Sequence, residues 1–219
     1  MGDKNHQQAI GLLGGTFDPI HIGHLRPALE ISEALSLQQL FLMPNHIAPH
    51  KSSSHASAKQ RSEMVRLAIQ GQVNISVDCR ELTRHSPSYT IDTLKEMKIQ
   101  YPSTPICFIM GMDSLMSFDT WHQWQNILNY CHLIISQRPG WQGQFNHLVQ
   151  KTVDLHKTSI KQDLHDLPYG KIYFQDTSQL DISSTQIRKL IYNKKSINYL
   201  VPEAVNDYIK KHNLYRKNS

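Results

Sequence analysis

The chain has 219 residues, a length that favours one domain over two small ones. Lysine and arginine outnumber aspartate and glutamate by 23 to 18, so the formal charge of +5 favours anionic ligands such as nucleotides. The basic residues are spread along the chain, which argues against a nucleic-acid-binding stripe, and no apolar stretch approaches the ~18 residues of a membrane span.

The cysteines and the N-terminus bear on location. Cys79, Cys107 and Cys131 each lie in or beside an apolar, strand-like segment, with no Cys-x-x-Cys pair among them. Such an odd, scattered set predicts reduced, buried thiols. Residues 1–8 are polar and lack the apolar core of a secretory signal, so we expect a cytoplasmic protein.

Short apolar segments rich in β-forming residues alternate with amphipathic segments along the chain, which predicts an α/β fold with a mostly parallel sheet. The expected strands are 9–13, 40–43, 73–77, 106–110, 133–136 and 172–174. The expected helices are 23–35, 61–70, 90–99, 183–192 and 203–212.

Two segments lack a clear period. Residues 45–57 are polar and predict a loop, whereas residues 140–170 are compatible with an inserted helix with loops or with partial disorder. We expect a single domain over residues 1–219, with a C-terminal helical part from about residue 183.

The segment Gly14 to His24, GGTFDPIHIGH, connects the first expected strand to the first expected helix. Gly14 and Gly15 would let the backbone approach a ligand closely and take dihedral angles closed to other residues, and a helix N-terminus attracts phosphate. His21 and His24 lie three residues apart, so both imidazoles could contact the oxygens of one phosphorus. A plain turn followed by two surface histidines is the alternative for each piece alone, but eleven consecutive residues in this context favour the phosphate site.

This segment resembles the signature of the HxGH nucleotidyltransferases, which transfer a nucleotidyl group to a phosphate-bearing acceptor. The resemblance implies a doubly wound, Rossmann-like sheet with helices on both faces. Residues 182–188, ISSTQIR, are similar to the second phosphate motif of this superfamily, with Ser183, Ser184 and Arg188 facing the outer phosphates. A serine-capped helix with an exposed arginine is the alternative for this motif.

Four further segments are similar to bacterial nicotinate-nucleotide adenylyltransferases: PNHIAPHK (44–51), PSYTIDTL (87–94), GMDSLMSFDTW (111–121) and SQRPG (136–140). The resemblance implies the reaction of ATP with nicotinate mononucleotide to give nicotinate adenine dinucleotide and pyrophosphate. It also implies Mg²⁺ bound mainly through the substrate phosphates, with no metal site on the protein itself.

The resemblance assigns a role to each matching position. For catalysis it implies His21, His24, Lys51 and Arg188. For ATP it implies Gly14, Gly15, Thr16, Phe17, Gly111, Asp113, Arg138, Ser183, Ser184 and Arg188. For the acceptor it implies Asn45, His50, Ser88, Tyr89, Thr90 and Trp121.

Some of these roles have alternatives. Core packing explains Tyr89 and Trp121 as well as a pyridine-stacking role does. Lys51 has the charge of an arginine without its bidentate geometry. Nicotinamide mononucleotide or phosphopantetheine as the acceptor, and a basic nucleic-acid-binding module, are the rival functions. Association into a homo-oligomer is left open.

Overall fold

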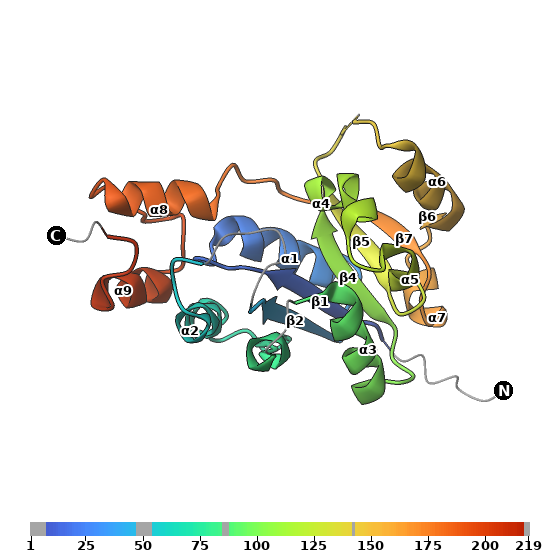
Figure 1. Ribbon diagram of the computed structural model, residues 1–219, viewed down its shortest axis with the longest axis horizontal. Coiled ribbons are helices and arrows are strands. Elements are labelled where there is room, and N and C mark those ends of the chain that lie inside the picture. Colours follow the sequence, from blue (N-terminus) through green and yellow to red (C-terminus); the bar gives the residue numbers. More distant parts are fainter. Residues whose placement is uncertain (1–7, 47–53, 85–87, 142, 217–219) are drawn as a thin grey trace. The chain divides into compact units, whose positions relative to one another are not determined.

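The computed structural model describes residues 8–46, 54–84, 88–141 and 143–216 (Figure 1). Within these ranges, seven strands are hydrogen-bonded in the order β3-β2-β1-β4-β5-β7-β6. The strands are β1 (Ile10–Gly15), β2 (Gln39–Pro44), β3 (Ile75–Val77), β4 (Ile106–Gly111), β5 (His132–Gln137), β6 (Lys157–Thr158) and β7 (Ile172–Asp176).

The strand pairing is that of a doubly wound sheet. β1 pairs in parallel with β4, β4 with β5, and β7 with both β5 and β6. The order reverses between β1 and β4, as in Rossmann-like folds. The predicted α/β, Rossmann-like fold is confirmed.

Helices connect these strands. They are α1 (Ile22–Ala34), α2 (Ala58–Ala68), α3 (Thr90–Gln100), α4 (Met112–Met116), α5 (Trp124–Ile127), α6 (His147–His156), α7 (Asp163–Asp166), α8 (Ser184–Tyr192) and α9 (Glu203–Lys211). Two 3₁₀ turns, η1 (Arg80–Thr83) and η2 (Phe118–Thr120), complete the set for the described residues. The segment 140–170, undecided from sequence, contains α6, β6 and α7, so the inserted helix is the correct alternative.

The chain divides into two compact units, each built from separate stretches of sequence. Unit 1 contains residues 1–13, 30–40 and 89–177, and unit 2 contains residues 14–29, 41–88 and 178–219. The expectation of a single domain over residues 1–219 stays a prediction.

Unit 1 is organised around β4 and β5, whose apolar residues are almost all buried. Cys107 and Cys131 are fully buried, and burial raises the pKa of the Cys107 thiol to about 12. Cys79, in unit 2, is only half-buried, so the expectation of three buried cysteines is wrong for this residue. All three thiols are free.

Unit 2 is held by the packing of α2 against α9. Met64 and Val65 of α2 and Val205 and Ile209 of α9 are buried, which gives each helix one apolar face. A capping box fixes the start of α2: the Ser57 hydroxyl accepts from the amide of Gln60, whose side chain accepts from the amide of Ser57. Among the described residues, no helix is long and apolar enough to cross a membrane.

Candidate active site

The signature segment connects β1 to α1 and lies in unit 2. Gly14 and Gly15 are the last residues of β1 and have extended backbone, so the expectation that they adopt dihedral angles closed to other residues is wrong. The left-handed residue is Phe17, with φ of 48° and a ring that is 2% exposed. A Cβ at Gly15 would lie 2.8 Å from this ring. Gly15 is therefore required by the packing of Phe17, independently of any ligand.

His21 and His24 face the same side of the start of α1, as expected. Their rings are stacked, with centroids 3.7 Å apart and planes inclined by 26°. The Phe17 ring contacts the His24 ring edge to face, at 5.2 Å. The backbone carbonyl of His21 accepts a hydrogen bond from the amide of His24 at 2.9 Å, which begins the first helical turn. The two imidazoles are therefore close enough to contact the same bound group.

His21 is neutral near pH 7. Its side chain is 4% exposed, and burial lowers the pKa of the imidazole to about 4. Its Nδ1 atom is buried and has no hydrogen-bond partner among the described residues. A buried polar atom of this kind costs free energy unless a ligand or water pairs with it, so it marks a position for a bound group.

Asp18, in the same turn, received no role from the sequence. Its carboxylate is 4% exposed and accepts hydrogen bonds from the amides of His55 and Ala56, at 2.8 and 3.1 Å, and from the Tyr215 hydroxyl at 2.7 Å. Its backbone carbonyl accepts from Arg188 at 2.6 Å. Asp18 therefore connects the signature to three other segments of unit 2.

Arg61, in α2, is a second residue that sequence reasoning missed. It is 1% exposed and donates to the carbonyls of Thr16, Asn45 and His46, at 2.6, 2.6 and 3.3 Å. Burial lowers the pKa of the Arg61 guanidinium, and the nearby charge of Asp18 opposes this effect. Arg61 thus joins the turn after β1 to the segment after β2.

A sequence signal for Arg61 exists. Arg61 precedes Met64, Val65 and Ala68 at the i, i+3, i+4 and i+7 positions of one helix face, so it lies on the apolar side of α2. A charged residue at such a position is typically paired when buried. Tyr215 has no comparable signal.

The second phosphate motif forms the start of α8, and two hydrogen bonds join it to the first motif. Ser184 donates to the Pro19 carbonyl at 2.9 Å, and Arg188 donates to Asp18 and to the Thr185 hydroxyl. The Ser183 hydroxyl accepts from the amide of Gln186, so the helix-cap interpretation is correct for this residue. The exposed arginine of the alternative interpretation is not found, because Arg188 is half-buried.

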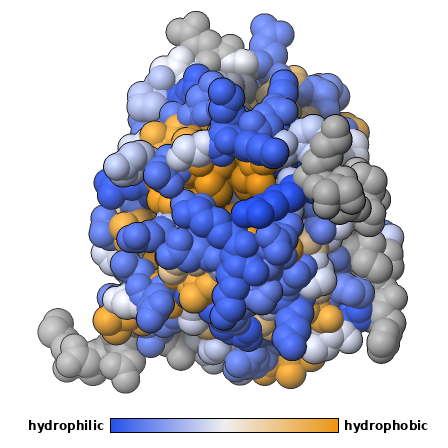
Figure 2. Space-filling model, turned by 90° about the vertical axis from the view of Figure 1, so that its left-hand side faces the viewer, coloured by the Kyte–Doolittle hydropathy of each residue, from blue (hydrophilic) through white to orange (hydrophobic). Residues whose placement is uncertain are grey.

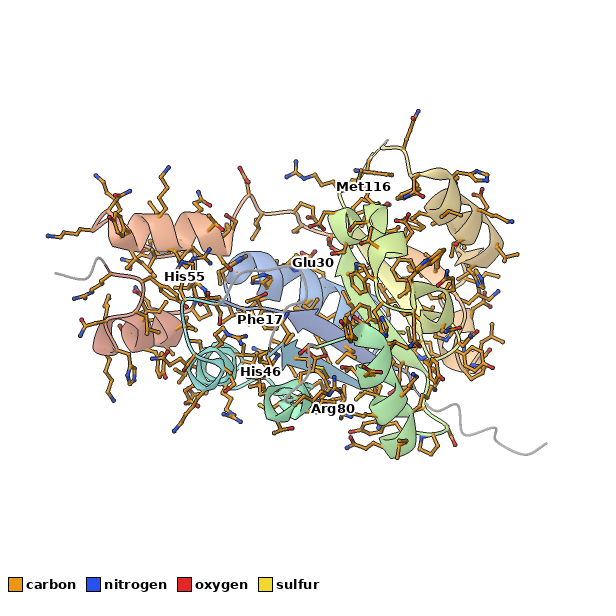
Figure 3. All side chains as sticks on the ribbon, in the orientation of Figure 1. Phe17, Glu30, His46, His55, Arg80 and Met116 are labelled. Atoms are coloured by element: carbon orange, nitrogen blue, oxygen red, sulfur yellow. The ribbon has the colours of Figure 1, made fainter. Side chains whose placement is uncertain are left out.

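The acceptor residues predicted in unit 2 are Asn45, Ser88 and His50. The Asn45 amide donates to the Gly15 carbonyl at 3.0 Å, and its side-chain Oδ1 is buried without a partner among the described residues. The backbone amide of His46, the residue after Asn45, donates to the Ser88 hydroxyl. Asn45 and Ser88 are therefore connected, whereas His50 and the predicted catalytic Lys51 lie outside the described residues. In Figure 3, the labelled Phe17, His46 and His55 identify the segments after β1, after β2 and before α2.

The remaining predicted residues belong to unit 1. Gly111 is the N-cap of α4, and the carboxylate of exposed Asp113 folds back against it. Tyr89 precedes the first residue of α3, Thr90, and makes no side-chain cap there. Arg138 follows β5 and is exposed. Gly111 and Asp113 therefore lie together at the start of α4, and Tyr89 and Thr90 lie at the start of α3.

The aromatic residues of unit 1 form two groups. Trp121 packs edge to face against Phe118 and Phe108, at centroid distances of 5.8 and 6.0 Å. Tyr89 packs against the exposed His122 at 4.3 Å. Both predicted residues are half-buried, so one part of each ring packs against the protein while another part reaches solvent.

A separate hollow lies beside the C-terminal ends of α8 and α9. It has a volume of about 460 Å³ and is lined by Ile191, Ile197 and Ile209 together with Lys194, Lys195, Lys210 and Arg216. Figure 2 shows the side of the molecule that bears these helices, where hydrophilic residues surround an apolar recess. Cations at helix C-termini offset the helix dipole, which accounts for these lysines without a ligand. None of the predicted site residues lines this hollow.

Comparison with known proteins identifies the family of the chain. A family model described as Cytidylyltransferase-like matches residues 12–190. A probable nicotinate-nucleotide adenylyltransferase of Psychromonas ingrahamii is 69% identical over 210 residues, which cover 96% of this chain and 98% of the relative. The chain belongs to the nicotinate-nucleotide adenylyltransferase family.

Other members of this family are also similar to the chain. The probable nicotinate-nucleotide adenylyltransferase of Aeromonas hydrophila is 47% identical over 94% of this chain and 97% of the relative. The structure of Plasmodium falciparum nicotinic acid mononucleotide adenylyltransferase complexed with NaAD superimposes with a TM-score of 0.71 at 23% identity, covering 95% of this chain and 97% of that one. At this identity the structural likeness shows the fold.

Proposed function

We propose that the chain transfers the adenylyl group of ATP to nicotinate mononucleotide, with release of pyrophosphate, as a step of NAD synthesis. The observation that carries the proposal is the stacked pair of imidazoles, His21 and His24, at the start of α1. The family supports the same reaction, since the 69% identical relative is named for it. A cytoplasmic location is part of the proposal and is supported by three free thiols.

The proposed mechanism is in-line attack of the acceptor phosphate on the α-phosphorus of ATP, without a covalent enzyme intermediate. His21 and His24 donate hydrogen bonds to the α-phosphate oxygens, on which negative charge increases in the transition state. The buried Nδ1 of His21 lacks a partner in the described residues, so a phosphate oxygen would satisfy it. Alignment of the two substrates supplies the remaining acceleration.

The triphosphate also requires contacts at its outer phosphates. We assign these contacts to the start of α8, where Ser183, Ser184 and Arg188 lie. Arg188 donates through one nitrogen to the Asp18 carbonyl and through another to the Thr185 hydroxyl, and together these bonds orient its guanidinium. Lys51 is proposed to neutralise the leaving pyrophosphate, and Gly111 and Asp113 to bind the adenosine ribose.

The residues present fit a Mg²⁺ ion that is held mainly by the substrate phosphates. Among the described side chains, no three of His, Cys, Asp or Glu gather as metal ligands. The carboxylate of the signature, Asp18, is engaged by three hydrogen-bond donors and offers little room for a cation. When bound, Mg²⁺ would neutralise phosphate charge. The protein would contribute its histidines and Arg188 beside it.

The acceptor distinguishes the rival functions. Nicotinamide mononucleotide differs from nicotinate mononucleotide by a neutral amide in place of the carboxylate. Phosphopantetheine has no pyridine ring. We assign the pyridine ring to the half-buried Trp121 and the nicotinate carboxylate to the start of α3, where no side chain caps the helix amides at Tyr89. A nucleic-acid-binding module would leave the stacked imidazole pair, with His21 buried, unexplained.

The test is a pyrophosphate-release assay with ATP, Mg²⁺ and each of the three acceptors. We expect turnover with nicotinate mononucleotide to exceed turnover with the other two at least tenfold. His21→Ala and His24→Ala should each lower kcat by about 100-fold or more, the loss typical of removing one transition-state donor. His147→Ala, at an exposed position in α6, is the matched control. Normal turnover in both signature variants would refute the mechanism.

A further inference from the structure

The carboxylate of Asp18 is held from two directions within unit 2. One oxygen accepts from Ala56 and from the Tyr215 hydroxyl, and the other accepts from the amide of His55. The residues that meet at this carboxylate are separated by 37 to 197 positions in sequence. Hydrogen bonds to an ionised carboxylate are shorter and stronger than those between neutral groups. Asp18 is therefore a strong point of attachment for the C-terminal segment.

The position of Asp18 gives this attachment a consequence. Asp18 precedes His21 by three residues, and its backbone carbonyl accepts the hydrogen bond of Arg188. The neighbouring Pro19 carbonyl accepts from Ser184. A displacement of Asp18 would thus be passed to the imidazole pair in one direction and to the start of α8 in the other.

Tyr215 is held firmly at its own end. The preceding Leu214 is buried, and its amide donates to the Ile209 carbonyl as the chain leaves α9. Tyr215 itself has a φ of 63°, a left-handed conformation that costs energy for a residue with a side chain. Burial and the Asp18 carboxylate together raise the pKa of the Tyr215 hydroxyl, so this group keeps its proton and remains a donor.

We infer that Tyr215 is a positioning residue for adenylyl transfer: its hydroxyl fixes Asp18, and Asp18 fixes the turn that carries His21 and the arginine that contacts the outer phosphates. The inference rests on the proposed function. Tyr215 acts through Asp18 and does not contact the substrate. It acts by keeping the donors of the signature and of α8 at the spacing that the transition state requires.

The test removes the hydroxyl alone. Tyr215→Phe should lower kcat roughly tenfold, within the ~100-fold that a displacement of about 1 Å can cost, with less than about a twofold change in KM for ATP. Tyr199→Phe is the matched control and should keep wild-type kcat, because Tyr199 is 94% exposed and has a left-handed backbone conformation like that of Tyr215. Assays are run well below the measured melting temperatures, so that a loss of stability alone would leave kcat unchanged.

A double-mutant cycle distinguishes action through Asp18 from an independent effect. We expect Asp18→Asn to lower kcat and the addition of Tyr215→Phe to lower it by less than about twofold more. Additive effects, or wild-type kcat in Tyr215→Phe, would overturn the inference. If Asp18→Asn does not fold, the comparison of Tyr215→Phe with Tyr199→Phe still decides. Failure of the proposed function would appear differently, as a wild-type protein that releases no pyrophosphate.

Discussion

Gly23 is packed directly against His21: a Cβ at Gly23 would lie 3.0 Å from His21 Nδ1 and 3.2 Å from the Ile182 carbonyl oxygen. The glycine between the two histidines therefore leaves room both for the first imidazole and for the segment that leads into α8. A methyl group at this position would have to displace one of them by a few tenths of an ångström.

Gly23→Ala should separate activity from stability. Alanine favours a helix over glycine by about 0.5–1 kcal/mol, which offsets part of the crowding, so we expect a melting temperature within a few degrees of wild type. The displaced His21 should lower kcat about tenfold or more. Calorimetry and the pyrophosphate-release assay measure the two quantities. A variant with wild-type kcat would show that the ring position tolerates this crowding.

Stability should fall as the pH is lowered from about 6.5 to about 4. Burial lowers the pKa of both His21 and His132 to about 4, so in this window the unfolded chain binds more protons than the folded one. The contribution of the two neutral histidines to the free energy of unfolding is fully present above about pH 6.5. His132 is fixed as a neutral ring because its Nδ1 accepts from the amide of Lys171 and its Nε2 donates to the Leu167 carbonyl.

Each of the two histidines should contribute about 1.3 kcal/mol to the difference in unfolding free energy between pH 7.5 and pH 5.5, from about 1.36 kcal/mol per pKa unit. Urea unfolding at the two pH values measures this difference. In His132→Asn the pH-dependent loss attributable to these two groups should shrink by about half. The same loss in the variant would assign the pH dependence to other groups.

Arg61→Lys should strongly destabilise the protein, although the substitution keeps the positive charge. The guanidinium reaches three carbonyls, and a single ammonium group cannot do so, which leaves buried acceptors without donors. We expect a loss of about 3 kcal/mol by chemical denaturation. Arg66→Lys, in the same helix but paired at the surface with Glu63 at 3.5 Å, should cost under about 0.5 kcal/mol. Equal losses would mean that the three carbonyl contacts contribute little.

Trp121 and Trp124 form a matched pair for the stacking hypothesis. Both rings pack edge to face on Phe118, at 5.8 and 5.7 Å, so alanine at either position should destabilise unit 1 to a similar degree. Only Trp121→Ala should also raise KM for nicotinate mononucleotide, by roughly tenfold, because stacking is worth up to about 1.5 kcal/mol. If both variants or neither raise this KM, Trp121 acts in core packing alone.

The central strands could be located from the sequence because burial on both faces gives them unbroken apolar runs. β4 and β5 were predicted to within one residue at each end. The short helices α4, α5 and α7 were missed, since four or five residues form little more than one helical turn and cannot show a repeating amphipathic pattern. β6 has two residues and forms only through its pairing with β7, so no local pattern could reveal it.

Within the candidate site, the local geometry was predictable and the long-range support was not. Three-residue spacing at a helix start places His21 and His24 on one side, and their stacked rings confirm it. The contacts of Asp18 with Ala56 and Tyr215 join distant parts of the sequence, and no local pattern encodes them. The glycine pair was misjudged because a close approach to Phe17, rather than an unusual backbone angle, explains Gly15.

The neutral state of His21 bears on product release. A fixed positive charge at the α-phosphorus would hold the dinucleotide product, which keeps this phosphorus, as firmly as it held ATP. An imidazole with a pKa of about 4 in its buried state can take up a proton when phosphate charge arrives and lose it when that charge departs. A turnover cycle limited by release of the anion would be faster with such a reversible donor than with a lysine in the same place.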